Sequence, residues 1–201
     1  RKAGIVYLAE TEKELAAHAA WVESARDYQI NARMLDAAQM DALLPGASKN
    51  FLGAMHTPDD CGAEPSLAAP AIAQAAMKAG VTMHEGCAAR GVETRAGRVS
   101  AVVTEKGRID CDAAVVAAGA WSRLFLGNLG IDFPQLWLLG SALRTKALPG
   151  GPEVTTGTST FAFRKRLDGG YTIARRNSTV AEITPDSFRL FLDFAPTALA
   201  Q

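Results

Sequence analysis

The feature that most constrains this chain is an uninterrupted apolar run, from Ala113 to Ala118, that ends in Gly119. Small and β-branched side chains without polar alternation predict a short strand buried on both faces, as in a parallel sheet. A glycine at the strand exit carries no Cβ, so its backbone can approach a ligand closely. Because ligands in open α/β sheets bind outside the carboxyl ends of the strands, Gly119 lies where we expect a cofactor.

The residues before this run predict a small hairpin that leads into it. Apolar and polar residues alternate from Arg98 to Thr104, and a second short strand follows from Arg108 to Cys111. Between the two strands, Glu105, Lys106 and Gly107 form a turn sequence.

With the residues that follow, this segment resembles one family of enzymes. The string from Arg98 to Ser122, which ends in the letters AAGAWS, is similar to a segment of the FAD-dependent oxidoreductases of the D-amino-acid oxidase and dehydrogenase type, which include glycine and sarcosine oxidases. Such an ending is much more specific than a glycine-rich turn alone, although apolar runs that end in glycine occur in many α/β proteins. The resemblance extends loosely over the whole chain.

The resemblance implies an α+β or α/β fold. Residues 87–125 would be part of an FAD/NAD(P)-binding Rossmann-like domain, interleaved with a substrate-binding domain of mixed antiparallel sheet and helices. That second domain would comprise residues 1–86 and 126–201.

No G-x-G-x-x-G fingerprint follows a strand and opens a helix in this sequence. In the family, the fingerprint precedes a sequence of this kind and a second flavin-binding segment follows it. We therefore expect an internal fragment of a flavoenzyme, which by itself binds FAD weakly or not at all.

By the resemblance, the intact protein oxidises a D-amino acid or small amine to an imine by hydride transfer to FAD. Two alternatives stay open: a non-catalytic α+β binding or interaction module, and a related flavoenzyme that acts on a hydroxy acid or glycerol phosphate. The sequence does not identify the substrate, the electron acceptor or the oligomeric state.

The resemblance places five residues near the cofactor. Ala117, Ala118 and Gly119 would face the dinucleotide through backbone groups, although a tight strand exit explains them without a ligand. Trp121 would pack beside the cofactor or cap the sheet, and an indole at a strand end is often simply core. Ala89 matches a family position, usually valine, whose backbone meets the adenine.

On the substrate side, Arg164 and Arg166 flank a predicted hairpin ahead of Tyr171. On an alternating strand the two arginines share one face. A guanidinium that faces inward can hold a carboxylate through two hydrogen bonds, and Tyr171 would orient the substrate. The alternatives are a solvated edge strand whose charges discourage aggregation, and a packing role for the tyrosine.

Composition argues against several kinds of partner. The net charge is zero and no basic block occurs, so nucleic acid is not an expected partner. No apolar run approaches the roughly 20 residues of a membrane span. The three cysteines stand far apart without a C-x-x-C pair, which indicates reduced thiols in the cytoplasm. His18, His56 and His84 have no partner at metal-ligand spacing, so we expect no metal site.

Elsewhere the sequence predicts alternating strands and helices. Thr11 with Glu14, and Asp36 with Gln39, have the capping-box spacing and each open a helix. The other predicted elements are strands at 4–9, 31–35, 51–56, 81–85, 87–92, 136–145, 160–166 and 171–175, an alanine-rich helix that ends at residue 80, and a last helix from residue 187.

Overall fold

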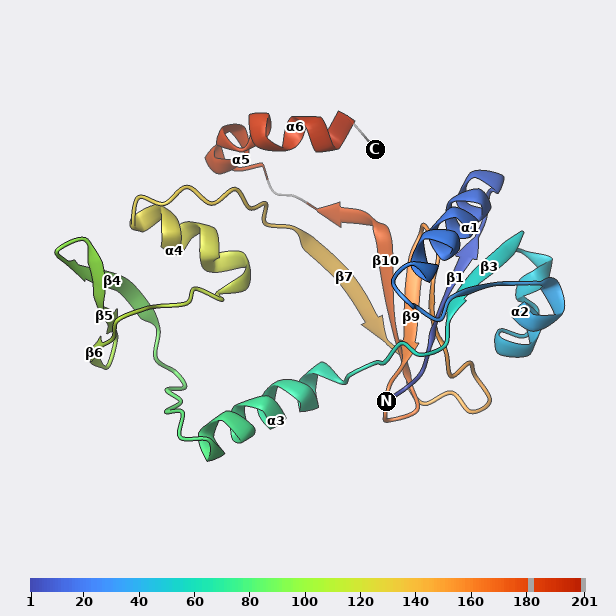
Figure 1. Cartoon of the computed structure of the whole chain (residues 1–201), viewed down its shortest axis with the longest axis horizontal. Coiled ribbons are helices and arrows are strands. Elements are labelled where there is room, and N and C mark those ends of the chain that lie inside the picture. The colour runs from blue at the N-terminus through green and yellow to red at the C-terminus, as the bar shows by residue number, and fades with distance from the viewer. Residues whose placement is uncertain (181–182, 200–201) are drawn as a thin grey trace. The chain divides into compact units, whose positions relative to one another are not determined.

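The computed structural model describes residues 1–180 and 183–199. Contacts divide the chain into two compact units, and each unit combines two stretches of chain. The first unit comprises residues 1–75 and 140–179, and the second comprises 76–139 and 180–201 (Figure 1). The domain boundaries expected from the sequence, after residues 86 and 125, stay a prediction.

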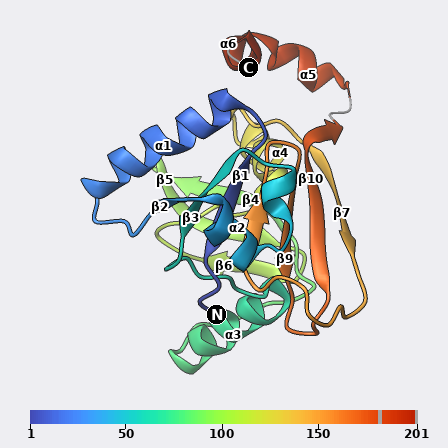
Figure 2. The same cartoon turned by 90° about the vertical axis from the view of Figure 1, so that its right-hand side faces the viewer.

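The first unit is built on a seven-stranded mixed sheet in the order β2-β3-β1-β8-β9-β10-β7. Its strands are β1 (Ile5–Ala9), β2 (Arg33–Leu35), β3 (Gly53–Thr57), β7 (Leu139–Arg144), β8 (Thr155–Gly157), β9 (Phe161–Lys165) and β10 (Tyr171–Val180). β1 runs antiparallel to β3 and parallel to β8, with Ile5 opposite Thr155. The predicted hairpin of β9 and β10 is confirmed, and Figure 2 shows these strands beside β7.

Two helices pack on this sheet, and both predicted capping boxes are confirmed. α1 (Glu12–Arg26) follows Thr11, and α2 (Ala37–Leu43) follows Asp36, each with both reciprocal hydrogen bonds. The side chain of Tyr7 contacts His18 of α1, whereas its neighbours on β1 face the core cluster. Because side chains alternate along a strand, the two helices cover opposite faces of the sheet. The core cluster on the α2 side contains Val6, Leu8, Leu35, Met40, Leu44, Ala47, Ala54 and Val154.

Glycines with positive φ mark the start of one further helical element and the end of another. The short 3₁₀ helix η1 (Ala47–Lys49) begins after Gly46, whose φ is +83°. The alanine-rich α3 (Pro65–Lys78) ends just before Gly80, whose φ of +94° is the left-handed conformation that closes helices. The predicted end of this helix is therefore confirmed.

The second unit contains a three-stranded antiparallel sheet, in the order β4 (Ala89–Arg95), β5 (Arg98–Thr104) and β6 (Gly107–Asp110). The predicted hairpin is confirmed, and Gly107 has a φ of +125° at its turn. The 3₁₀ helix η2 (Gly119–Trp121) then leads directly into α4 (Ser122–Asn128). Near the end of the chain, the predicted last helix is divided into α5 (Pro185–Arg189) and α6 (Phe191–Leu199).

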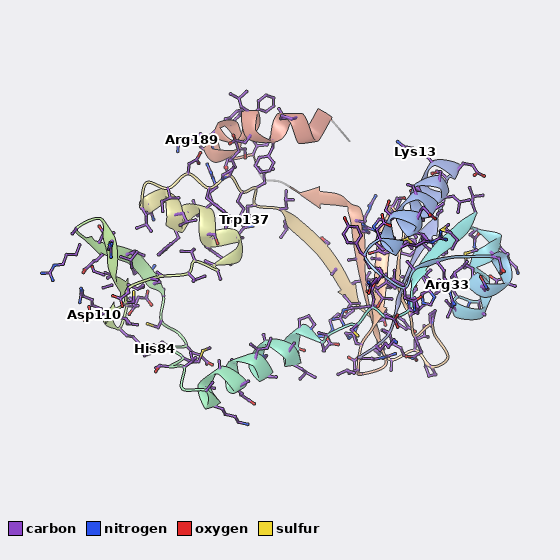
Figure 3. All side chains as sticks on the ribbon, viewed as in Figure 1. Lys13, Arg33, His84, Asp110, Trp137 and Arg189 are labelled. Carbon is purple, nitrogen blue, oxygen red and sulfur yellow. The ribbon has the colours of Figure 1, made fainter. Side chains whose placement is uncertain are left out.

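The strand predicted over 113–118 is wrong for this structure. These residues have no regular secondary structure, and Val115 is 92% exposed. A strand buried on both faces needs a hydrogen-bonded neighbour and a covering layer, and no strand of the described residues pairs with this run. The strand predicted over 81–85 is wrong for the same reason, and Figure 3 shows His84 on this irregular segment.

Candidate cofactor site

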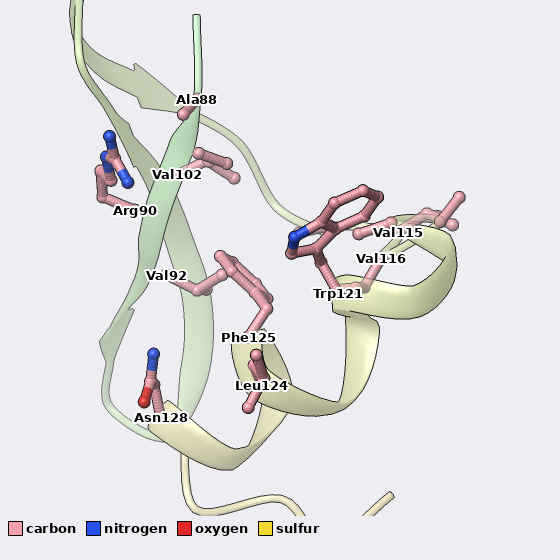
Figure 4. Close-up of a pocket in the computed structure, with 14 residues that line it drawn as sticks. Ala88, Arg90, Val92, Val102, Val115, Val116, Trp121, Leu124, Phe125 and Asn128 are labelled. Atoms are coloured by element: carbon pink, nitrogen blue, oxygen red, sulfur yellow. The ribbon is translucent and has the colours of Figure 1, made fainter. Parts of the chain in front are cut away.

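The second unit has a hollow of about 780 Å³ beside its small sheet. β4, β5, the run 114–118 and the start of α4 surround it (Figure 4). Four of the five residues singled out for the cofactor line this hollow, namely Ala89, Ala117, Ala118 and Trp121. The fifth, Gly119, directly follows the lining run, and its φ of +55° turns the chain into η2. Their contact with a cofactor stays a prediction.

The walls of the hollow are mainly apolar. Val92 and Val102 come from the sheet, and Phe125 comes from α4. Figure 4 shows Trp121 on the opposite side of the hollow from β4. The Trp121 indole is 62% exposed, and it packs edge-on against Trp137 with ring centroids 5.3 Å apart. Trp121 is therefore not a core residue of the described structure, and its ring is available to a ligand.

Backbone groups add to the polarity of this hollow, which the polar residues Arg90 and Asn128 also line. Within the described residues, the amides of 114–117 make no hydrogen bond, because no strand pairs with them. Apart from the half-buried Val116, these residues are exposed, so their amides are open to a ligand. Free amides beside small side chains and an apolar wall suit a dinucleotide, which has polar edges and flat rings. The residues present therefore fit FAD.

An ion pair lies at the rim of the hollow. The Arg90 guanidinium pairs with the Glu105 carboxylate, which also accepts a hydrogen bond from the Ala88 N–H at 3.3 Å. The pKa of Glu105 is lowered below its ordinary value of 4.5, mainly by the hydrogen bond from Arg90 and secondly by the one from the Ala88 N–H. Glu105 is therefore ionised at neutral pH.

A second hollow, of about 370 Å³, lies in the first unit between the start of α3 and the end of β9. Arg164 lines it and donates two hydrogen bonds to Glu64, at 2.9 and 3.2 Å. The guanidinium lowers the pKa of Glu64, and the carboxylate raises the pKa of Arg164. Lys165 also lines this hollow and pairs with Glu153. Arg164 is thus the predicted substrate residue that borders open space.

Arg166 and Tyr171 have their polar groups engaged inside the first unit. The Arg166 side chain is 5% exposed and donates to Asp168 and to the carbonyls of Thr145 and Tyr171. The buried Tyr171 hydroxyl donates to the Pro152 carbonyl at 2.8 Å. Neither residue lines the hollow that Arg164 borders. Their role toward a substrate stays a prediction.

Glu64 and Glu105 are site candidates that the sequence patterns do not single out. Glu64 lies 100 positions from Arg164, so no local spacing connects the two. The pair of Arg90 and Glu105 was not predicted either, because the predicted hairpin joins 98–104 to 108–111 and leaves Arg90 outside it; in the structure the pairing of β4 with β5 brings the two residues together.

The histidines do not gather with other ligands. No group of three metal-ligating side chains occurs among the described residues. His84 is exposed, and His18 lies beside Tyr7. His56 is buried, and its Nδ1 has no hydrogen-bond partner in the part of the chain described. The pKa of His56 is lowered, mainly because the imidazole is buried and secondly because Arg33 is positively charged.

The mixed sheet of the first unit and the apolar hollow of the second define a protein of mixed α/β architecture with a candidate ligand site. The sequence matches the DAO family, described as FAD dependent oxidoreductase, over residues 1–200. The chain therefore belongs to this family. The family and the fold class expected from the sequence are confirmed.

Curated relatives match most of this chain. The D-amino acid dehydrogenase of Sinorhizobium medicae is 33% identical over 146 residues, which cover 71% of this chain and 35% of that protein. The D-amino acid dehydrogenase of Chromohalobacter salexigens is 26% identical over 209 residues, 94% of this chain and 50% of that protein. The chain thus spans half or less of the length of these two relatives.

Solved structures share the fold. The L-amino acid deaminase from Proteus myxofaciens, in complex with anthranilate, superposes on this chain with a TM-score of 0.89 at 34% sequence identity. The match covers 96% of this chain and 44% of the deaminase chain. The glycine oxidase from Bacillus cereus has a TM-score of 0.76 at 18% identity, with 98% and 55% coverage, and shows the fold alone.

Proposed function

We propose that the protein oxidises an amino acid or a small amine to an imine, with FAD as the hydride acceptor. When bound, the flavin supplies the redox chemistry by accepting the hydride of the α-carbon, and water hydrolyses the released imine. The observation that carries the proposal is the gathering of Ala89, Ala117, Ala118 and Trp121 around one hollow in a chain of this family. The names of the relatives, D-amino acid dehydrogenase and L-amino acid deaminase, support an amino-acid substrate.

The residues of the second unit bind the cofactor in this proposal. The free amides of 114–118 hydrogen-bond the dinucleotide, and the backbone of Ala89 meets the adenine. Trp121 offers a flat apolar surface, which Trp137 holds in place. Gly119 lets the chain turn away immediately after the lining run.

On the substrate side, Arg164 holds the carboxylate. Its fork of N–H donors suits two carboxylate oxygens, and it borders the hollow of the first unit. A substrate carboxylate has to share or replace the bond with Glu64, so Glu64 tunes the affinity of Arg164 for the substrate. Arg166 and Tyr171 shape the β9–β10 hairpin that carries Arg164.

The test uses protein expressed from the complete reading frame that contains these residues. Its flavin absorbance is recorded, and D-amino acids, L-amino acids, small amines, hydroxy acids and glycerol phosphate are offered with a dye as electron acceptor. We expect a yellow protein that reduces the dye with amino acids or amines. Turnover only with hydroxy acids or glycerol phosphate would replace the proposed substrate class. A protein without flavin would favour a non-catalytic binding module.

We further propose that the protein works in the cytoplasm. No helix in residues 1–180 or 183–199 combines the length and the apolar character needed to cross a bilayer. Support for the location comes from Cys61, Cys87 and Cys111, which are all free thiols. Fractionation of the source cells tests it, and recovery in a secreted fraction would contradict it.

A further inference from the structure

The hollow of the first unit has in its wall an ion pair that joins two elements far apart in the chain. Glu64 directly precedes α3, Arg164 lies on β9, and both residues line the hollow of about 370 Å³. The Arg164 Nη1 and Nη2 atoms donate to the two oxygens of the Glu64 carboxylate, at 3.2 and 2.9 Å. The Arg164 side chain is 30% exposed and the Glu64 side chain 17%, so the pair is neither buried nor fully solvated.

The two partners do not exhaust each other's hydrogen-bonding capacity. A guanidinium has more N–H donors than the two that Arg164 directs at Glu64 in the described structure. The oxygens of an ionised carboxylate likewise have further lone pairs. Glu64 is ionised at neutral pH, because Arg164 and, to a smaller extent, the Leu167 N–H hold its pKa below 4.5. The pair therefore presents a positive and a negative charge side by side to a ligand.

The other charged side chains that line this hollow have a different partner. Arg1 and Lys165 both pair with the carboxylate of Glu153, which does not line the hollow. Most of the remaining wall is formed by small or apolar side chains, among them Leu67 and Ala68 of α3. A ligand in the hollow thus meets one accessible pair of opposite charges against a mainly apolar wall, and hollows of a few hundred Å³ with such walls are typical of small-molecule sites.

A molecule with an ammonium group next to a carboxylate matches this pair. Its carboxylate accepts the remaining N–H groups of Arg164, while its ammonium donates to the oxygens of Glu64. A molecule with only one of the two charges does not match. A hydroxy acid brings its carboxylate close to that of Glu64, and a simple amine brings its ammonium close to the guanidinium of Arg164. Like charges placed side by side in this way select against the wrong ligand.

We propose that Glu64 binds the ammonium group of the substrate beside the carboxylate held by Arg164, and that it thereby restricts the substrate to α-amino acids. The role of Glu64 rests on the proposed function, because it takes the hollow beside Arg164 as the substrate site. It makes Glu64 a residue that determines specificity. It also excludes amines without a carboxylate, hydroxy acids and glycerol phosphate as substrates.

Three ligands that share a methyl group separate the two charges. Alanine has both charges, lactate has only the carboxylate, and ethylamine has only the ammonium; both enantiomers of alanine and lactate are used. Their dissociation constants are measured by calorimetry on protein made from the complete reading frame, with the flavin reduced beforehand so that no turnover occurs.

The variants are Glu64→Gln and Arg164→Ala. The matched control is Glu93→Gln, because Glu93 is also paired with an arginine, Arg108 at 2.8 Å, and lines neither hollow. Circular dichroism verifies that each variant is folded.

We expect Glu64→Gln to weaken alanine relative to lactate by about tenfold, the worth of one hydrogen bond to a charged group. Lactate itself should bind no more weakly than before, because glutamine does not repel its carboxylate. Arg164→Ala should weaken alanine and lactate but not ethylamine, because Glu64 then has no competing guanidinium. A pair that only ties α3 to β9 would change all three ligands together, and that result would refute the role of Glu64.

The outcomes separate this inference from the function on which it rests. If the unmodified protein is yellow and oxidises amino acids, while Glu64→Gln keeps the same preference for alanine over lactate as Glu93→Gln, the role of Glu64 is refuted and the proposed function stands. If the unmodified protein binds ethylamine or lactate as tightly as alanine, the restriction to amino acids is refuted. If it contains no flavin but prefers alanine through Glu64, the ligand site stands and the proposed function fails.

Discussion

Replacing Arg166 with alanine should destabilise the first unit strongly, although sequence alone suggests a substrate role for this residue. Its buried guanidinium donates to the carbonyls of Thr145 and Tyr171 and to Asp168. We take the loss of each hydrogen bond to a carbonyl to cost about 1.5 kcal/mol of unfolding free energy, which is the lower end of the range for hydrogen bonds to a charged group. The Tyr171 carbonyl keeps one bond, from the N–H of Thr145. The contacts with the half-exposed Asp168 add little.

The expected loss is thus about 3 kcal/mol, which lowers Tm by roughly 6–12 °C for a chain of this size. Arg144 is the matched control, because it contacts the same Asp168 oxygen at 3.4 Å with a side chain that is 71% exposed. Arg144→Ala should leave Tm nearly unchanged, because exposed ion pairs contribute little. Thermal melts followed by circular dichroism make the comparison.

Equal melting temperatures for the two variants would refute the reasoning, because burial would then not set the value of an arginine contact. A conservative variant separates the remaining roles. Arg166→Lys keeps the charge but not the fork of donors, so it should lose part of the stability. An unchanged Tm for Arg166→Lys, together with a raised KM for amino acids, would instead assign Arg166 to the substrate.

Three other predictions follow from the same structure. Cationic partners lower the pKa of Glu64, Glu153 and Asp168. The contribution of these carboxylates to stability is therefore complete above their ordinary pKa values of 4.5 and 3.8, and it is lost as the pH falls through their lowered pKa values. Thermal melts from neutral to acid pH should show this loss, and a Glu64→Gln variant with the same acid slope would contradict it. Gly119→Ala should cost about 1 kcal/mol through its positive φ while meeting no atom of the chain within 4 Å; if FAD affinity does not also fall, Gly119 is not beside the cofactor. The 201-residue chain produced alone should purify without colour, because its sequence has no G-x-G-x-x-G fingerprint to hold the pyrophosphate; a stoichiometric flavin spectrum would disprove this.

Local signals in the sequence predict the local structure well. The capping boxes at Thr11 and Asp36, and the turn that ends at Gly107, each depend on residues within four positions. Their chemistry is complete within the element itself, so the sequence is enough to place them.

Features that depend on distant neighbours could not be predicted in this way. The run 113–118 has the composition of a buried strand, but a strand forms only where another strand supplies hydrogen bonds. Likewise, Arg164 finds its partner 100 positions away. Only the family resemblance pointed to Ala89 as a residue of the cofactor site, because an alanine side chain has no functional group that marks a binding site.

The exposed run 113–118 has a consequence for handling this polypeptide. It combines six consecutive apolar residues, no charge and no proline with free backbone amides. Such a stretch is a template for intermolecular β-pairing and is typical of aggregation-prone segments. Concentrated solutions of the isolated polypeptide should therefore form thioflavin-positive assemblies that nucleate at this stretch, and a single lysine in place of Val115 should delay them.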